Sequence, residues 1–365
     1  MTSTPTPDAA TGKPKLVVDG VLHAFNFTRE NVLTPLADDI LRNSYGGLAL
    51  TGDNELIGPE DFLRNWTVEE LAHLAFVESD IDVGVFHGVP WFDYFADGFV
   101  DNAKGIEMRR RWPNRVLFYG TVDPLRPDAV EQVEYLVREG GAIGIKLYPE
   151  NWRHRENRVE PVLLDAPNLE PVVTKVLELG VPIAIHKAIP AGRGLTDLYK
   201  LGDVEQAALR YPDLQIEVVH SGAAFIEETA YIMLRYPNVW ANLESTAIYA
   251  VRFKRRFAQM LGALMSSGAA DRIIFASGSP VGHPQPMLEA LYDFEMPQDL
   301  VGDYGYPPIT PEVRAGILGL NFARLHGLDP DALRAGIADD EFARAKVAGR
   351  QPRWSGVTAS LSRTQ

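Results

Sequence analysis

Short hydrophobic runs rich in β-branched residues alternate with longer amphipathic stretches between residues 15 and 328. The amphipathic stretches repeat their apolar residues at the spacing of a helix, whereas the short runs have the length and composition of buried strands. Eight such runs occur: Leu16–Val18, Asp82–Phe86, Val116–Gly120, Ala142–Leu147, Pro182–Ile185, Gln215–Val219, Val239–Leu243 and Arg272–Ala276. The alternation predicts repeated strand–helix units around a parallel sheet.

One local motif joins a predicted helix to the next strand three times. Residues 111–114, 210–213 and 235–238 read Arg-Trp-Pro-Asn, Arg-Tyr-Pro-Asp and Arg-Tyr-Pro-Asn. Proline cannot continue a helix, and Asn or Asp closes a tight turn. Eight strands in a body slightly above the roughly 250 residues of a typical (β/α)8 barrel predict an α/β TIM barrel rather than a doubly wound sheet. Residues 27–66 are then an insertion after strand 1 that builds or covers the site.

The composition limits domain organisation and partners. Residues 1–13 and 349–365 lack apolar periodicity and are expected to be disordered tails around a single domain at 14–348. The chain has no cysteine, which excludes disulfides and thiolate chemistry, and its net charge of −14 argues against nucleic acid as a partner. A membrane span and a secretory leader are both missing from the sequence, so a cytoplasmic location is expected.

Ionisable residues gather where the predicted strands end. Five of the eight histidines lie there, with a lysine and a glutamate: His23, His87, Lys146, His186, His220, Glu244 and, in the turn after strand eight, His283. The carboxyl ends of barrel strands share one rim, and burying so many ionisable groups is costly without a metal or a reaction. The sequence therefore predicts a metal site at this rim. No chemistry is assigned to His73, His154 or His326.

Several motifs resemble those of the amidohydrolase-like metal-dependent barrels. They are Gly-Ile-Lys-Leu-Tyr-Pro at 144–149, the strand-end His186, Val-His-Ser-Gly at 219–222, Ile-Phe-Ala-Ser-Gly-Ser-Pro at 274–280 and the closing stretch 317–327. Two positions depart from the pattern that the resemblance implies. Val21 stands where hydrolytic and decarboxylating members carry the first histidine of a His-x-His pair. Gly278 stands where they carry an aspartate that ligates the metal and takes a proton from water.

A divergent branch of these barrels is similar at His-Pro-x-Pro, residues 283–286, and at Asn-Leu-Glu, residues 242–244. It contains non-haem diiron monooxygenases of diterpenoid antibiotic biosynthesis, of the platensimycin and platencin type. The resemblance implies a monooxygenase with two iron ions, or zinc or manganese in their place, and dioxygen. The implied substrate is bulky and lipophilic or a CoA thioester, and a homo-oligomer is possible. The implied ligands are His23, His87, His186, His220, Glu244 and His283, and the implied catalytic residues are His220 and Lys146.

Two other interpretations remain open. The first is a mononuclear hydrolase or decarboxylase in which His220 is the acid or base and the ligand set is rebuilt. The second is a metal-free barrel that binds a ligand through a degenerate site. Both metal-dependent interpretations require His186 and His220 to lie within about 10 Å of each other, since metal–ligand bonds are about 2 Å long. Trp91, Phe92 and Tyr94, in a loop after strand two, are expected near the substrate.

Overall fold

The computed structural model describes residues 14–153, 158–188 and 194–357. Its centre is an eight-stranded parallel sheet in the order β1-β2-β5-β6-β9-β10-β11-β12. The strands are β1 Val18–Leu22, β2 Val83–His87, β5 Val116–Thr121, β6 Gly144–Leu147, β9 Ile183–His186, β10 Ile216–Val219, β11 Val239–Asn242 and β12 Ile273–Ile274. Backbone bonds join the two edges, from Gly20 N to Phe275 O at 2.9 Å and from His23 N to Ser279 O at 2.8 Å. The predicted barrel is confirmed.

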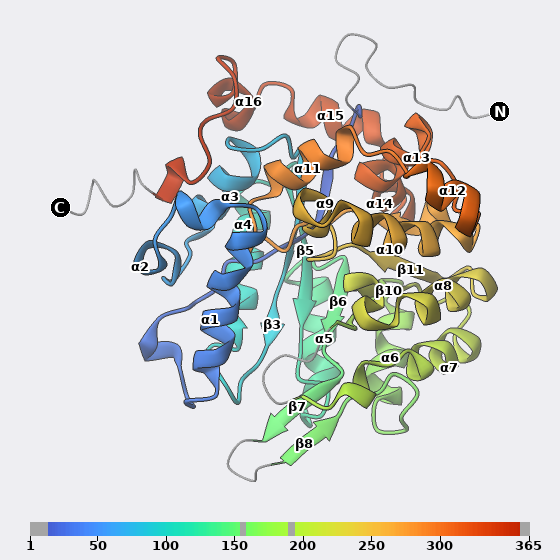
Figure 1. Cartoon of the computed structure of the whole chain (residues 1–365). Coiled ribbons are helices and arrows are strands. Elements are labelled where there is room, and N and C mark those ends of the chain that lie inside the picture. Colours follow the sequence, from blue (N-terminus) through green and yellow to red (C-terminus); the bar gives the residue numbers. More distant parts are fainter. Residues whose placement is uncertain (1–13, 154–157, 189–193, 358–365) are drawn as a thin grey trace.

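Helices cover the outside of the barrel (Figure 1). Those between the strands are α3 Val68–Phe76, α4 Asn102–Arg111, α5 Ala129–Arg138, α6 Glu170–Glu178, α7 Gly202–Arg210, α8 Ile226–Arg235, α9 Tyr249–Arg252 and α10 Lys254–Ser266. After β12 come α11 Pro284–Tyr292, α12 Gln298–Tyr304, α13 Pro311–Ala315, α14 Asn321–Leu325, α15 Pro330–Ile337 and α16 Glu341–Ala345. Two short antiparallel pairs, β3 Val89–Pro90 with β4 Phe99–Val100 and β7 Glu150–Arg153 with β8 Arg158–Pro161, stand apart from the barrel sheet.

The repeated Arg-aromatic-Pro-Asx motif ends a helix and precedes a strand in all three copies, as predicted. Helices α4, α7 and α8 end at Arg111, Arg210 and Arg235, and a strand begins within a few residues each time. In the third copy, Asn238 Nδ2 donates to the carbonyl oxygens of Tyr211 at 3.1 Å and Leu214 at 2.9 Å. The third turn is therefore also tied to the second, which fixes β10 beside β11.

The insertion forms α1 Ala37–Gly47 and α2 Pro59–Phe62 and packs against the end of the chain. Figure 1 shows the C-terminal segment returning to the side of α2 and α3. Trp354 is 1% exposed, and its ring lies 6.0 Å from that of Trp66. The expected tail from residue 349 is thus wrong as far as Val357, because this indole completes a core that the insertion leaves open. Residues 1–13 and 358–365 lie outside the described part.

Two apolar layers hold the barrel. The larger lies between strands and helices, while a smaller cluster fills the amino-terminal half of the interior and includes Tyr119, Ala184, Trp240 and Phe322. Phe322 comes from α14, so this helix closes the amino-terminal end. Within the described residues, helices long and apolar enough to cross a membrane are lacking.

Candidate active site

The carboxyl ends of six strands bring six of the seven predicted site residues together. His87 and His186 are the last residues of β2 and β9, Lys146 lies within β6, and His23 and His220 follow β1 and β10 directly. Glu244 comes two residues after β11. All six are buried, with Lys146 and His87 fully enclosed. Parallel strands place these positions at one rim, which is why strand-end residues far apart in sequence meet.

Glu244 is the centre of this cluster. Its Oε1 lies 3.2 Å from His23 Nε2, and its Oε2 lies 3.4 Å from His220 Nε2 and 3.7 Å from Lys146 Nζ. His220 Nε2 is also 3.1 Å from His186 Nδ1. The contact between His186 and His220 satisfies the distance that both metal-dependent interpretations require.

Backbone groups orient the two histidines that flank Glu244. His23 Nδ1 lies 2.8 Å from the carbonyl oxygen of His87, and His220 Nδ1 lies 3.0 Å from the carbonyl oxygen of Glu244 itself. As the donor in each bond, Nδ1 carries the proton, which leaves Nε2 with a lone pair toward the carboxylate region. His220 and Ser221 adopt φ angles of 65° and 54°, a left-handed turn that aims His220 back over the rim.

The electrostatics of the cluster favour one anion among neutral imidazoles. Burial alone would raise the pKa of Glu244, but the nearby His220 and Lys146 hold it well below its usual range. Burial lowers the pKa of Lys146, and it lowers those of His87 and His186 well below the ordinary value, with a further contribution from neighbouring cationic groups. Glu244 is thus ionised at neutral pH, whereas His87 and His186 are neutral.

Unpaired polar atoms are enclosed beside Glu244. Both ring nitrogens of His87, Nζ of Lys146 and Oε2 of Glu244 have no hydrogen-bond partner among the described residues. Leaving such groups unpaired costs roughly 1–3 kcal/mol each, so they mark a place for an ion or a polar ligand. In the described part of the chain, however, no group of three or more His, Asp or Glu side chains is arranged around a common metal position. The Nε2 lone pairs of His23 and His220 face the Glu244 carboxylate at 3.2 and 3.4 Å, and a bound cation would offset that repulsion.

The space beside Gly278 is filled by the carboxylate of Glu244, which follows β11. A Cβ added at Gly278 would lie 3.1 Å from both Cγ and Oε1 of Glu244, and the residue has a φ of 70°. The Glu244 side chain therefore fills the space beside Gly278. A carboxylate absent from the end of β12 is supplied from the end of β11.

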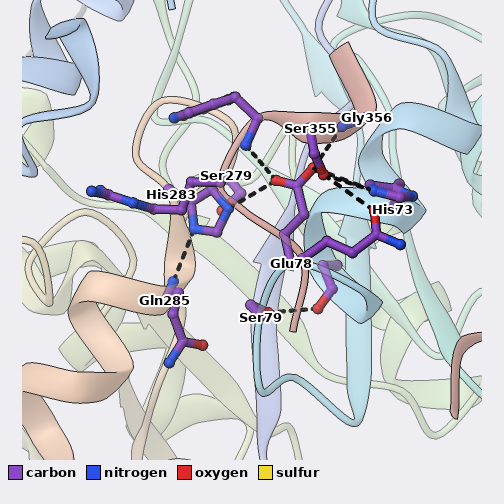
Figure 2. A network of polar contacts seen from close by, with 12 residues as sticks. His73, Glu78, Ser79, Ser279, His283, Gln285, Ser355 and Gly356 are labelled. Atoms are coloured by element: carbon purple, nitrogen blue, oxygen red, sulfur yellow. Dashed lines mark hydrogen bonds and ion pairs between the residues drawn. The ribbon is translucent and has the colours of Figure 1, made fainter. Parts of the chain in front are cut away.

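His283 is not brought to this cluster, which corrects its prediction as a metal ligand. Figure 2 shows it between Glu78 and Gln285 instead. Its Nε2 lies 3.1 Å from Glu78 Oε2, and its Nδ1 accepts the Gln285 amide at 3.2 Å as the N-cap of α11. Glu78 also accepts from the backbone of Trp354 and Gly356. Both ring nitrogens of His283 are therefore used, Nδ1 in capping α11 and Nε2 in contacting Glu78, which binds the C-terminal segment.

The rim carries a narrow pocket between the β3–β4 loop and β7. A cavity of about 20 Å³ is lined by Trp91, Phe92, Tyr94, Arg153 and Tyr199, among others. This volume holds about one water molecule, so a substrate would have to displace side chains at the rim. Trp91, Phe92 and Tyr94 line this pocket, and their contact with a substrate stays a prediction.

Three polar residues inside the barrel were missed by sequence reasoning. Tyr119, Glu217 and His326 form hydrogen bonds below the cluster, on the amino-terminal side. Tyr119 and Glu217 lie within strands, where the sequence gives no sign of which side faces the interior. The sequence indicates only one of the three, because Glu217 is a carboxylate within a predicted strand that is otherwise largely apolar.

The sequence profile of the amidohydrolase family matches residues 57–328. The chain belongs to this family. A search of curated protein sequences finds no match.

The similar solved structures include the following three. An uncharacterised TIM-barrel protein from Bordetella bronchiseptica has a TM-score of 0.58 at 19% identity, over 85% of this chain and 98% of that one. The 5-carboxyvanillate decarboxylase of Novosphingobium aromaticivorans, with manganese and 4-hydroxy-3-methoxy-5-nitrobenzoic acid, has 0.56 at 15%, over 90% and 100%. A zinc-containing amidohydrolase of Burkholderia multivorans has 0.54 at 15%, over 86% and 100%.

These comparisons correct the function expected from the sequence. The chain belongs to the amidohydrolase family, and its structural neighbours are decarboxylases and hydrolases rather than oxidoreductases. The expectation of an iron monooxygenase in antibiotic biosynthesis is wrong. It relied on two short motifs, of which His-Pro-x-Pro is a helix cap and Asn-Leu-Glu places a carboxylate that either chemistry can use. The neighbours bind manganese or zinc, and nothing supports two iron ions. The CoA thioester and the homo-oligomer remain predictions.

Proposed function

We propose that the chain is a metal-dependent decarboxylase of a small carboxylic acid. The observation that carries the proposal is the position of Glu244, whose carboxylate fills the space beside Gly278. Solved structures of the same fold include decarboxylases with bound benzoic acid derivatives. The alternative function is hydrolysis, and the experiment below distinguishes it from decarboxylation.

The proposed ligands are His23, His186, His220 and Glu244. Three imidazoles and one carboxylate suit zinc, manganese or another borderline divalent ion. Three pairs of these donor atoms lie 3.1–3.4 Å apart, and the side chains would have to turn to surround one ion. When bound, such an ion supplies a positive charge that polarises a carbonyl or carboxylate group.

Glu244 is a poor base for activating water. Oε1 is engaged by His23 Nε2, Oε2 faces His220 and Lys146, and the pKa of the carboxyl is held well below its usual range by those neighbours. A hydrolase needs a group that takes a proton from its nucleophilic water. Decarboxylation needs no nucleophilic water, and it requires a positive environment for the electron pair left on the substrate. Lys146, which is enclosed and has no hydrogen-bond partner among the described residues, contributes to that environment.

His87 and Lys146 face the reacting region with unpaired nitrogens. Both side chains are fully buried, so water does not compete for their hydrogen bonds to a substrate. Such hydrogen bonds are stronger in the interior than on the surface. We assign them to binding and orienting the substrate carboxylate rather than to holding the ion.

The test is carbon dioxide release from a panel of hydroxybenzoic acids and a parallel panel of lactone dicarboxylates. Purified protein is stripped of metal and reloaded with manganese or zinc. The proposal expects metal-dependent carbon dioxide from at least one acid, and its loss in His186→Ala. Lactone opening without carbon dioxide would overturn the proposal in favour of hydrolysis. Leu209→Ala, on the exposed face of α7, is the matched control.

A further inference from the structure

A row of hydrogen-bonded side chains crosses the barrel interior below the active site. The Tyr119 hydroxyl donates to Oε1 of Glu217, and it lies 2.6 Å from Nε2 of His326. Oε2 of Glu217 accepts from Asn242 Nδ2 at 3.1 Å. Since the single hydroxyl proton of Tyr119 goes to Glu217, His326 is the donor to the tyrosine oxygen and carries its proton on Nε2.

The inner end of this row lies at the level of the site. In the sheet, Lys146 of β6 is in register with Ala184 of β9, and Ala184 is in register with Glu217 of β10. Neighbouring residues in register point to the same face, and Ala184 contributes only a methyl group between the two longer side chains. Lys146 and Glu217 are both fully buried. Glu217 and Lys146 therefore both point into the barrel interior, on strands separated by β9.

The outer end of the row meets an open cavity at the amino-terminal end of the barrel. His326 follows α14 and lines a cavity of about 470 Å³ together with Ile143, Pro182 and Gln215, which precede their strands. The His326 ring also packs on Phe322, with ring centroids 4.5 Å apart. With Nε2 bonded to Tyr119, Nδ1 is the ring nitrogen left to exchange a proton with water in the cavity.

The protonation states suit two neutral donors, His326 and Tyr119, that lead to a carboxylate acceptor, Glu217. Burial lowers the pKa of His326 to about 3, so its imidazole is neutral at physiological pH. Burial and the adjacent Glu217 raise the pKa of Tyr119 well above its usual range, and burial raises the pKa of Glu217. A proton then moves along the chain by transfer from each group to its neighbour, and neither His326 nor Tyr119 stays charged.

We propose that His326, Tyr119 and Glu217 form a proton relay that connects the active site with solvent at the opposite end of the barrel. A proton from water binds His326 Nδ1, the Nε2 proton passes to the Tyr119 oxygen, and the Tyr119 proton passes to Glu217. Glu217 then passes a proton to Lys146, its charged neighbour in the site, after Lys146 has given its own proton to the substrate carbon. One proton enters at His326 and one reaches the substrate, so the relay returns to its starting charge.

The relay rests on the proposed function, which consumes one proton per turnover. In decarboxylation the bond between the substrate carbon and its carboxylate breaks, carbon dioxide leaves, and the electron pair that stays on the substrate forms a bond to a proton. The pocket at the rim is narrow, and a bound substrate would block the entry of water there. A route from the amino-terminal end of the barrel supplies the proton while the substrate stays bound.

The first arm of the test measures carbon dioxide release by Tyr119→Phe and His326→Phe, with thermal unfolding as a check on folding. Tyr119→Phe removes only the hydroxyl group, and His326→Phe keeps a ring against Phe322. We expect a roughly 10²-fold lower rate in both, because general acid–base transfer commonly contributes that much. Imidazole in the buffer should partly restore His326→Ala. Asp213→Asn, which changes an exposed residue of the same cavity, should leave the rate unchanged.

The second arm needs no substrate. The Tyr119 hydroxyl proton is assigned by NMR from its absence in Tyr119→Phe, and its exchange with water is followed by saturation transfer. The relay predicts exchange that slows at least about tenfold in His326→Phe and stays unchanged in Asp213→Asn. Exchange that is equal in wild type and His326→Phe would overturn the relay. If no acid is decarboxylated by the wild type, the proposed function fails, and this second arm still decides the relay.

Discussion

The ion pair between Glu244 and Lys146 gives the sharpest test of the site as described. Glu244→Gln keeps the shape of the side chain but removes the charge that faces Lys146 Nζ at 3.7 Å. At an effective dielectric constant of about 20, two unit charges at that separation attract by about 4–5 kcal/mol. Removing one partner of a buried pair typically costs about 3–5 kcal/mol.

The assay is a double-mutant cycle on metal-free protein, with Glu244→Gln, Lys146→Met and both changes together. Urea unfolding gives the free energy of each variant. We expect each single variant to lose about 3 kcal/mol and the double variant to lose much less than their sum, since the unpaired charge is then gone. Burial already lowers the pKa of Lys146, so release of its proton limits the penalty in Glu244→Gln. A coupling energy below about 0.5 kcal/mol would refute the reasoning.

The same pair predicts a pH dependence. The folded-state pKa of Glu244 is depressed, so its contribution to stability is present at neutral pH and is lost as the pH falls through that value. The coupling energy should therefore shrink on acidification. A small coupling that does not change on acidification would show that the carboxyl is already protonated at neutral pH.

Further predictions concern other parts of the structure. Gly278→Asp should cost about 1–3 kcal/mol of stability, because a Cβ there meets Glu244 and φ is 70°, and Glu244→Ala in the same chain should recover part of that loss in thermal unfolding. Trp354→Ala should cost about 3–5 kcal/mol in urea unfolding, as expected for a buried indole, and a loss below about 1 kcal/mol would mean that the C-terminal segment is not part of the core. Burial would raise the pKa of Glu78, but the interactions with His283 and the hydrogen bonds from Gly356 and Ser355 together lower it, so Glu78→Gln should flatten the acid limb of the stability profile; an unchanged limb would contradict this. Manganese at about 100 times its dissociation constant should stabilise the wild type by about 2.7 kcal/mol and His186→Ala by much less, measured as a shift in unfolding.

The barrel and most of the site could be predicted because both depend on local periodicity. Once strands are recognised, parallel pairing forces His186, His220 and Glu244 to one rim. The position of His283 could not be predicted, since the loop after β12 runs away from the rim to cap α11. Trp354 gave no signal because a single aromatic residue in a polar stretch has no period. Tyr119, Glu217 and His326 depend on which side of a strand faces the interior and on where α14 packs.

Labelled water tests the central claim most directly. The metal-loaded enzyme is incubated with the acid that releases carbon dioxide, in a mixture of D₂O and H₂¹⁸O, and the product is analysed by mass spectrometry. The account predicts one deuterium on the carbon that carried the carboxylate and no oxygen-18 in the organic product. Oxygen-18 in the organic product, with no deuterium on that carbon, would contradict decarboxylation and establish attack by water.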